Sequence, residues 1–311
     1  MAIDSKVQFH DSAKYEDHDE SKNIIYMSLF FEVFMQKELN NRLFNYMPNR
    51  QFNKTYWDGD YDWSAHGEEW SAAWGGSKMQ WYGSILPRIH SHVPSGRILE
   101  IASGYGRWTT FLKNLCGELI LVELSEECLE ASKQRFRGER HITFHLNDGR
   151  SLDMIADKSV DFIFSFDSLV HADLPTLKAY LSQFPRILSN NGVAFLHHSN
   201  LGEYEATYSA IRKVPQLWPL LKRMGLVEKT LHKRDPGVRA SDVKKLIEEQ
   251  GMTCTSQEIV HWGTKRTYLD CFTTLSRNSS GNPITGSHHR NPNFMSEAEH
   301  LRQIAHLYTD R

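Results

Sequence analysis

Two glycines and an acid within residues 97–108 carry the most specific chemical signal of the chain. Glu100 stands in an apolar run, and Gly104 and Gly106 follow it. Glycine allows a tight turn at positive φ and lets a ligand approach the main chain closely. The helical pattern that comes next would point its N-terminal N–H groups at that ligand. This arrangement predicts a binding site for a nucleotide-like cofactor.

The spacing around the turn discriminates between cofactors. A dinucleotide fingerprint has a third glycine and an acid about 20 residues further on. Here Thr109 stands in place of the third glycine, and the acid Glu100 comes early, which suits a pyrophosphate poorly. The pattern suits a cofactor with a free ammonium and carboxylate, such as S-adenosylmethionine. Glu-x-Ala-x-Gly-x-Gly resembles motif I of the class I methyltransferases, with Ser103 where many relatives have proline or glycine.

Further polar groups stand at the ends of the next apolar runs. Glu123 ends the second run, where a carboxylate can accept both ribose hydroxyls. Asn147 and Asp148 follow the third run, within reach of an adenine amino group, and Asp167 follows the fourth. Each acid alone could simply cap the following helix. Their recurrence at successive strand ends favours a shared site instead.

These groups must be positioned by an α/β fold. Ser125 predicts the N-cap of a helix that runs to about Phe136. Helical and apolar segments alternate at the spacing of parallel βαβ units, which implies a doubly wound sheet. The expected architecture is a Rossmann-like, seven-stranded sheet with an antiparallel last strand. Its strands are expected at residues 98–101, 118–123, 142–146, 160–166, 193–198, 253–260 and 267–275.

The resemblance to class I methyltransferases covers about residues 74–275. Residues 97–202 look like a bacterial family with Gly-Arg-Trp in motif I, Asn-Asp-Gly-Arg-Ser-Leu, Phe-Asp-Ser-Leu-Val-His and His-His-Ser-Asn. The resemblance implies S-adenosyl-L-methionine as cofactor, and related enzymes often methylate hydroxyls of sugars, polysaccharide ends or other natural products. The residues expected to bind the cofactor are Trp81, Glu100, Ala102, Ser103, Gly104, Gly106, Arg107, Trp108, Glu123, Leu124, Asn147, Asp148, Gly149, Phe166, Asp167 and Ser168.

Methyl transfer to a hydroxyl needs a base, because the acceptor loses its proton as the bond forms. A histidine near its ordinary pKa of about 6.5 can take that proton. His171 follows the fourth strand, and His198 stands at the tip of the fifth as the competing base. His197 and His198 would point to opposite faces of that strand, so at most one is expected to face the pocket. Asp167 could orient the base or contact the sulfonium side of the cofactor.

A divalent ion is an alternative use of the same residues. His171, Asp173, His197, His198 and Asn200 could gather around a metal, as in some sugar methyltransferases that use magnesium. Magnesium prefers oxygen ligands, and zinc would be unusual for this chemistry. No metal site is therefore predicted.

The two ends of the chain differ from its middle. Residues 1–73 are expected to form an N-terminal tail, a helix and an aromatic-rich cap, and residues 74–275 the methyltransferase domain. Residues 203–238 read as a lid insertion of two amphipathic helices, and residues 276–311 as a linker and a C-terminal helix. The cap can fold over the cofactor mouth, with Trp74 and Trp81 favoured as lid residues. Its aromatic side chains could equally form a minor core under a long loop.

Composition is that of a soluble enzyme. The 311 residues are 40% hydrophobic, with a formal net charge of −2 at pH 7. This charge gives no strong attraction to nucleic acid or to an anionic membrane. No apolar run is long enough for a transmembrane helix, and the four scattered cysteines fit a cytoplasmic location. The C-terminal helix could pack on the N-terminal helix or on a partner subunit in a homo-oligomer.

Several functions are open at this point. The pattern favours O-methylation of a hydroxyl on a sugar or another small-molecule acceptor. Methylation of an amine or carboxylate would need no general base. A non-catalytic scaffold that binds S-adenosylmethionine is a third reading, which the intact motif I and Glu123 disfavour. A dehydrogenase is disfavoured by the missing third glycine.

Overall fold

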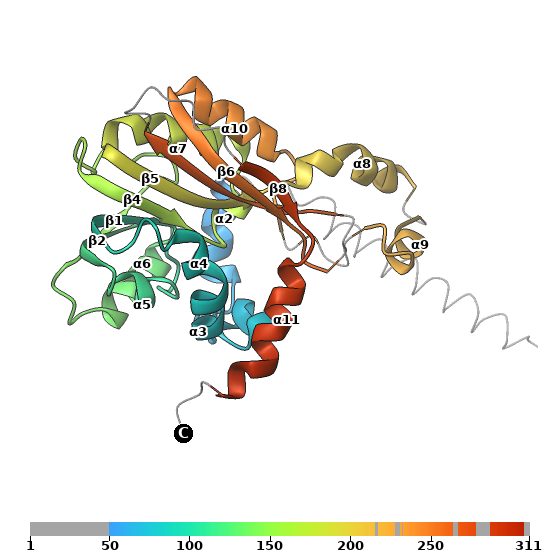
Figure 1. Cartoon of the computed structure of the whole chain (residues 1–311), viewed down its shortest axis with the longest axis horizontal. Helices are drawn as coiled ribbons and strands as arrows, with labels where there is room; N and C mark the ends of the chain where they lie inside the picture. The colour runs from blue at the N-terminus through green and yellow to red at the C-terminus, as the bar shows by residue number, and fades with distance from the viewer. Residues whose placement is uncertain are drawn as a thin grey trace, which may run out of the picture. The chain divides into compact units, whose positions relative to one another are not determined.

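The computed structural model describes residues 50–214, 217–227, 231, 233–263, 267–277 and 287–307. The expected tail and helix before residue 50 lie outside these ranges, as do residues 278–286 of the expected linker. The described part is an α/β structure built on one central sheet (Figure 1).

The sheet has eight strands in the order β3-β2-β1-β4-β5-β7-β6-β8, one more than expected. Strand β7 runs antiparallel to both of its neighbours, and the other neighbouring pairs are parallel, which confirms the predicted antiparallel strand. The strands are β1 (Ser95–Ile101), β2 (Cys116–Glu123), β3 (Ile142–Leu146), β4 (Val160–Ser165), β5 (Leu188–Ser199), β6 (Met252–Val260), β7 (Asp270–Arg277) and β8 (Ser287–Asn291).

The additional strand comes from the segment expected to be a linker. Strand β8 pairs in parallel with β6 at the edge of the sheet. Its side chains are exposed except that of Asn291, which is half-buried. An edge strand without a buried face shows no apolar alternation, so the sequence carries no strand signal here.

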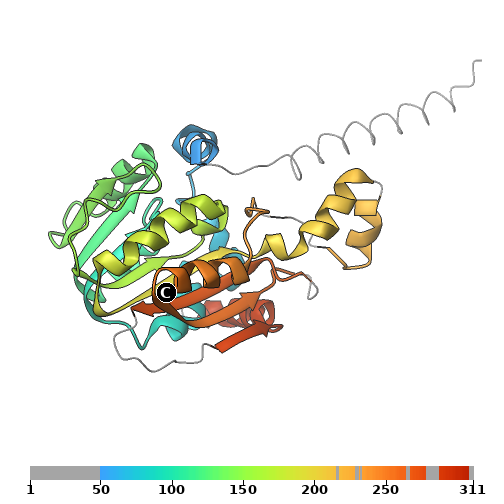
Figure 2. The same cartoon turned by 90° about the horizontal axis from the view of Figure 1, so that it is seen from above.

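Helices cover both faces of the sheet (Figures 1 and 2). On one face α7 and α10 bury a stripe of aliphatic side chains against β1, β4 and β5. On the other face the aromatic core includes Trp74, Trp81 and Phe294. The α-helices are α2 (Arg50–Thr55), α3 (Ser77–Gln80), α4 (Leu86–Ile89), α5 (Thr109–Leu112), α6 (Glu126–Arg135), α7 (Leu174–Ile187), α8 (Glu205–Lys213), α9 (Leu217–Arg223), α10 (Ala240–Glu249) and α11 (Phe294–Ile304).

Short helical turns complete the chain. These are η1 (Tyr56–Asp60), η2 (Glu68–Trp74), η3 (Trp81–Ile85), η4 (Leu169–His171), η5 (Leu201–Tyr204) and η6 (Ala305–Leu307). No helix in the described ranges is both long and apolar enough to cross a membrane.

The strand order places the ends of β1, β2 and β4 beside one another. Strand β1 pairs with β2 on one side and with β4 on the other, so the chain direction around the sheet reverses there. Open α/β sheets bind ligands in the crevice outside the carboxyl ends of the strands at such a point. Helix α6 begins where predicted, because the Ser125 hydroxyl accepts a 3.1 Å hydrogen bond from the Cys128 backbone N–H.

The insertion and the C-terminal helix form as helices. The insertion contributes α8 and α9, as its amphipathic pattern predicted. Helix α11 packs on η2 and α3 of its own chain. Leu301 lies so close to Gly83 that a Cβ at residue 83 would stand 2.4 Å from the leucine Cδ2. A larger residue at position 83 would therefore require the Leu301 side chain to move.

Candidate active site

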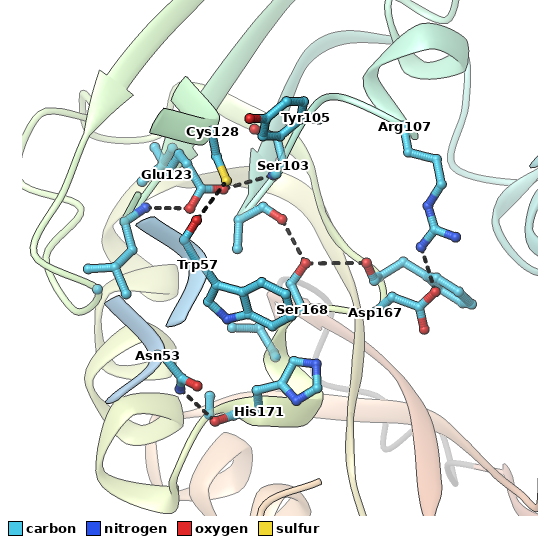
Figure 3. Close-up of a pocket in the computed structure, with 18 of the residues that line it drawn as sticks. Asn53, Trp57, Ser103, Tyr105, Arg107, Glu123, Cys128, Asp167, Ser168 and His171 are labelled. Carbon is cyan, nitrogen blue, oxygen red and sulfur yellow. Dashed lines mark hydrogen bonds and ion pairs between the residues drawn. The ribbon is translucent and has the colours of Figure 1, made fainter. Parts of the chain in front are cut away.

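A cavity opens at the carboxyl ends of the parallel strands (Figure 3). It holds about 940 Å³ of empty space, its open mouth included, and its walls are mostly apolar. Its polar groups come from the end of β2, from the turns after β1 and β4, from η4, from the cap before β1 and from α7. The predicted residues that line it are Ala102, Ser103, Gly104, Arg107, Trp108, Glu123, Leu124, Gly149, Phe166, Asp167, Ser168 and His171.

The turn after β1 has the positive-φ backbone that its glycines predict. Gly104 has a φ of 56° and Gly106 a φ of 78°, and Ala102 adopts 60° as well. The Ser168 hydroxyl donates a 2.7 Å hydrogen bond to the Ala102 carbonyl and fixes this unusual residue. Gly106 lies behind the cavity wall, where a Cβ would meet Phe136 at 2.4 Å. Gly106 thus lets α6 pack closely against the turn and does not itself contact the cavity.

Glu123 lines the cavity from the end of β2 and organises the turn opposite. Its Oε2 accepts a 2.8 Å hydrogen bond from the Gly104 N–H, and its Oε1 accepts from Leu124 N (2.8 Å) and Ser125 N (3.0 Å). Burial raises the pKa of Glu123, and these three N–H donors act in the opposite direction. The carboxylate therefore joins the first two strand ends into one wall.

Glu100 lies elsewhere than the sequence suggested. Its side chain is buried beneath the turn and does not line the cavity; its Oε2 accepts a 2.6 Å hydrogen bond from the Thr109 hydroxyl. Burial raises the pKa of Glu100 to about 8, although the Thr109 hydroxyl opposes that rise. A carboxyl group held in this way supports the start of α5 from inside the protein.

The turn after β3 presents its backbone to the cavity. The Asn147 side chain accepts from Gly149 N at 3.0 Å and donates to the Tyr180 hydroxyl at 3.0 Å. Asp148 accepts from the backbone of Arg150 and Ser151. Both side chains serve the turn itself, and Gly149 is the residue of this turn that lines the cavity.

The cap covers the cavity with different tryptophans from those expected. Trp57, Trp63 and Trp70 line it, and the Trp63 ring stacks on Tyr105 with centroids 4.5 Å apart. Trp74 and Trp81 lie in the aromatic core instead, because η2 and η3 turn them toward the sheet and α11. Trp81 stacks on Phe111 at 5.0 Å, so a role at the cavity mouth does not fit its position.

His171 lines the cavity from η4 beside Trp57, with ring centroids 5.3 Å apart. Its Nδ1 lies 2.7 Å from the Lys233 carbonyl oxygen. A carbonyl can only accept, so Nδ1 carries the proton and Nε2 keeps its lone pair. Burial, together with the nearby Arg234 guanidinium, lowers the pKa of His171 to about 4. The imidazole is therefore neutral near pH 7.

His198 is not a cavity residue. It is fully buried in the sheet, where Nε2 lies 2.7 Å from the Thr273 hydroxyl and Nδ1 lies 2.8 Å from the Ser199 carbonyl. The Gln257 amide donates to the same Thr273 hydroxyl at 3.2 Å. Side chains alternate along a strand, so His198 takes the face covered by α10 and His197 takes the opposite one.

Asp167 is the cavity end of a buried network of charged side chains. Arg107 Nη2 donates to Asp167 Oδ2 at 2.6 Å, and His197 Nδ1 lies 3.3 Å from Asp167 Oδ1. His197 Nε2 lies 3.0 Å from Asp270 Oδ2, and Arg234 Nη2 donates to that oxygen at 2.7 Å. Burial alone would raise the pKa of Asp167 and lower that of His197. The opposite charges outweigh burial and hold the Asp167 pKa well below its usual range and that of His197 above it.

Within the described ranges, no group of three or more histidine, cysteine, aspartate or glutamate side chains is placed to hold a metal ion.

Comparison with known proteins decides the class of this site. Residues 98–192 match a family described as a methyltransferase domain. This segment is therefore similar to a methyltransferase domain. It spans β1 to the first residues of β5 and contains most of the polar residues that line the cavity.

Solved structures of methyltransferases align with this chain, and one of them reaches a TM-score that indicates a shared fold. Magnesium protoporphyrin IX methyltransferase from Synechocystis PCC 6803, solved with bound S-adenosylhomocysteine, aligns with a TM-score of 0.50. The identity is 16%, over 74% of this chain and 100% of that one. A methyltransferase from Leishmania major aligns with a TM-score of 0.49 and 13% identity, over 73% and 82% of the two chains. A comparison with curated proteins gave no significant match.

The cavity of the methyltransferase domain fits its cofactor, S-adenosylmethionine. A carboxylate has about four acceptor positions, and Glu123 uses three of them for backbone N–H groups. The remaining position points to Glu123 as an acceptor for the ribose hydroxyls, as the sequence predicts. Gly104 provides the close backbone approach, since a Cβ there would already lie 3.3 Å from the Trp63 ring. Leu124 and Cys128 give the same end of the cavity an apolar wall.

Replacing Glu123 with glutamine should weaken the binding of S-adenosylhomocysteine at least tenfold. The amide nitrogen cannot accept from Gly104 N, and the variant loses a charge-assisted hydrogen bond, worth about 1.5–3 kcal/mol, to the cofactor. Isothermal titration calorimetry measures the affinity. Glu127→Gln is the matched control, because Glu127 accepts from the Tyr105 hydroxyl on the surface and does not line the cavity. Equal affinity for both variants would leave Glu123 with a structural role alone.

The sequence did not identify several cavity residues in the cap and in α7. Asn53 donates to the His171 carbonyl at 2.8 Å, and Arg50 donates to the Asp148 carbonyl at 3.1 Å. Tyr180 and Thr176 complete the wall from α7. The high aromatic content of residues 50–82 was the one signal that pointed to the cap.

Proposed function

We propose that this chain transfers the methyl group of S-adenosylmethionine to a hydroxyl of a small molecule, such as a sugar or another natural product. The observation that carries this proposal is the neutral imidazole of His171 at the cavity wall, with its proton on Nδ1. A hydroxyl is a poor nucleophile until its proton is removed, whereas a carboxylate or a neutral amine needs no base. A histidine in this state would have little use in the other two reactions.

Bound S-adenosylmethionine supplies a methyl group that is already activated for displacement. His171 takes the hydroxyl proton on Nε2, while its Nδ1–H stays on the Lys233 carbonyl. The nearby Asp167 and Asp270 carboxylates favour the charge that forms on the ring, but burial and the Arg234 guanidinium outweigh them, so the ring gives its proton up again readily. Trp57 and Trp63 exclude water from the reacting groups and provide flat apolar surfaces for an acceptor ring.

The proposal is tested by the kind of bond that the transferred methyl group forms in the product. The protein is incubated with S-adenosylmethionine that carries a deuterated methyl group and with panels of sugars, phenols, amines and carboxylic acids. Mass spectrometry then detects labelled products. An O-methyl ether survives mild alkali, whereas a methyl ester is hydrolysed and an N-methyl product keeps its basic nitrogen. Label in ethers alone supports O-methylation, and label confined to esters or amines refutes it.

The pH dependence of kcat/KM should follow the depressed pKa of His171. With a pKa of about 4, the base form persists from about pH 8 down to about pH 5. The rate constant should be flat over this range, halve by about pH 4 and fall about tenfold per pH unit below that. An acid limb centred near pH 6.5 would instead indicate a solvent-exposed histidine as the base.

Stability must be followed in the same experiment. The unfolded chain carries a histidine pKa of about 6.5, and His171 in the folded protein has a pKa of about 4. A depressed folded-state pKa contributes stability that is present above pH 6.5 and is lost as pH falls through 4. Rates are therefore measured directly after a pH jump, with near-ultraviolet circular dichroism confirming the folded state.

A further inference from the structure

Residues 233–235 lie against the face of η4 that carries His171. The Lys233 carbonyl accepts the Nδ1–H of His171 at 2.7 Å, and the Asp235 N–H donates to the Val170 carbonyl at 3.0 Å. Two consecutive residues of η4 are thus held by one short segment. This segment comes from the end of the insertion after β5, far from η4 in sequence.

Lys233 adopts a backbone conformation that needs support. Its φ is 54°, a value uncommon for a residue other than glycine. Such a conformation persists only where the surroundings hold it, and it is the one that turns the Lys233 carbonyl toward His171.

Arg234 is the side chain that holds the segment in place. Its Nε donates to Asp270 Oδ1 at 3.0 Å and its Nη2 donates to Asp270 Oδ2 at 2.7 Å, as a two-point contact. The guanidinium carbon also lies 5.4 Å from the ring centroid of Trp262. Asp270 is fully buried at the start of β7, so the anchor belongs to the rigid sheet.

We propose that Arg234 is a positioning residue for methyl transfer: by anchoring residues 233–235 to Asp270, it keeps the Lys233 carbonyl on His171 Nδ1 and the lone pair on Nε2. Arg234 does not line the cavity and would act only through this carbonyl. The inference rests on the proposed function for its effect on turnover, but its effect on the imidazole can be measured without an acceptor.

The Nε2 atom of His171 is the atom that would accept the proton in the proposed reaction. No hydrogen-bond partner of Nε2 occurs among the described residues, and His171 lines the cavity. If the Lys233 carbonyl moved away, the ring would lose the contact that selects the Nδ1–H tautomer. A neutral imidazole in solution favours the Nε2–H form, in which Nε2 cannot accept a proton.

The tautomer is read by ¹⁵N NMR of the imidazole nitrogens in the whole protein, with the His171 signals assigned by their loss in His171→Asn. In the unaltered protein Nδ1 should be protonated and Nε2 should not. Arg234→Gln should shift the population toward the Nε2–H form and lower kcat at least tenfold, with the KM for S-adenosylmethionine within about twofold. Arg234→Lys, which keeps a charge against Asp270, should restore most of the Nδ1–H population.

Arg239→Gln is the matched control. Arg239 follows residues 233–235 along the chain and donates a 2.9 Å hydrogen bond to the Gly202 carbonyl, not to a group beside His171. It should retain the tautomer and the turnover of the unaltered protein. A folded Arg234→Gln variant with an unchanged tautomer would overturn the proposal.

Two further outcomes are separable. If Arg234→Gln does not fold, an Nε2–H signal for His171 in the unaltered protein would overturn the proposal, and an Nδ1–H signal that persists in Arg234→Lys would support it. If the tautomer shifts as expected but His171→Asn still turns over normally, the positioning role stands and the proposed hydroxyl chemistry fails.

Discussion

Replacing His171 with asparagine is expected to slow methyl transfer to a hydroxyl by about 10²–10⁴-fold, the usual contribution of a general base. Asparagine cannot take a proton, but it is close in size and can donate to the Lys233 carbonyl. The binding of S-adenosylhomocysteine should stay within a few-fold of the unaltered protein. Single-turnover kinetics with labelled cofactor and calorimetric titration provide the two measurements.

The control for this result is His198→Asn. His198 was the competing base in the sequence, and the structure places it in the sheet beside Thr273. Its replacement should lower stability, while the folded fraction turns over normally. Loss of turnover in His198→Asn but not in His171→Asn would transfer the role to His198. Normal turnover in both variants would favour an amine or a carboxylate as the acceptor.

His197 and His198 show what the alternation along a strand can predict about side-chain positions and what it cannot. Alternation along β5 correctly predicts that His197 and His198 point to opposite faces. It does not say which face leads to the cavity, because that depends on where Asp167 and Asp270 lie in three dimensions. Asp167 follows β4 and Asp270 begins β7, 103 positions apart in the chain. No local signal could have placed His197 between them.

The fold was predictable where apolar runs mark buried strands. Strands β1 to β7 all form near the expected residues: apolar runs mark the strands in the middle of the sheet, and alternation marks β6 and β7. The edge strand β8 was not predicted from the sequence, because four of its five side chains are exposed and so show no apolar pattern. A strand that is buried selects apolar residues, whereas a strand held at an edge by backbone hydrogen bonds alone does not.

The cap shows that the sequence could not predict which of its aromatic side chains face the cavity. The sequence reveals that residues 50–82 are rich in aromatic side chains, and the cap does cover the cavity. Its irregular helical turns have no regular period from which an inward or outward face could be read. The sequence favoured Trp74 over Trp57 as a lid residue, although Trp57 lines the cavity and Trp74 lies in the core.

Replacing Asp270 with alanine is expected to lower the free energy of unfolding by about 3–5 kcal/mol, the usual effect of removing one partner from a buried ion pair. Asp270 is fully buried, and its loss would leave the Arg234 guanidinium, itself 8% exposed, without its carboxylate. Urea unfolding at pH 7 measures the change. Asp157→Ala is the matched control, because Asp157 pairs with Arg186 at the surface and should contribute less than about 1 kcal/mol.

A second variant separates the ion pair from simple loss of packing. In Asp270→Ala combined with Arg234→Met, no guanidinium is left buried without a partner, so much of the lost stability should return. Methionine still fills the space beside Trp262. If the double variant is no more stable than Asp270→Ala, the loss comes from the cavity left at residue 270 and from the contacts to His197 and Trp262. If Asp270→Ala unfolds no more easily than Asp157→Ala, the buried network does not anchor the end of the insertion to the sheet, and another contact must hold the Lys233 carbonyl against His171.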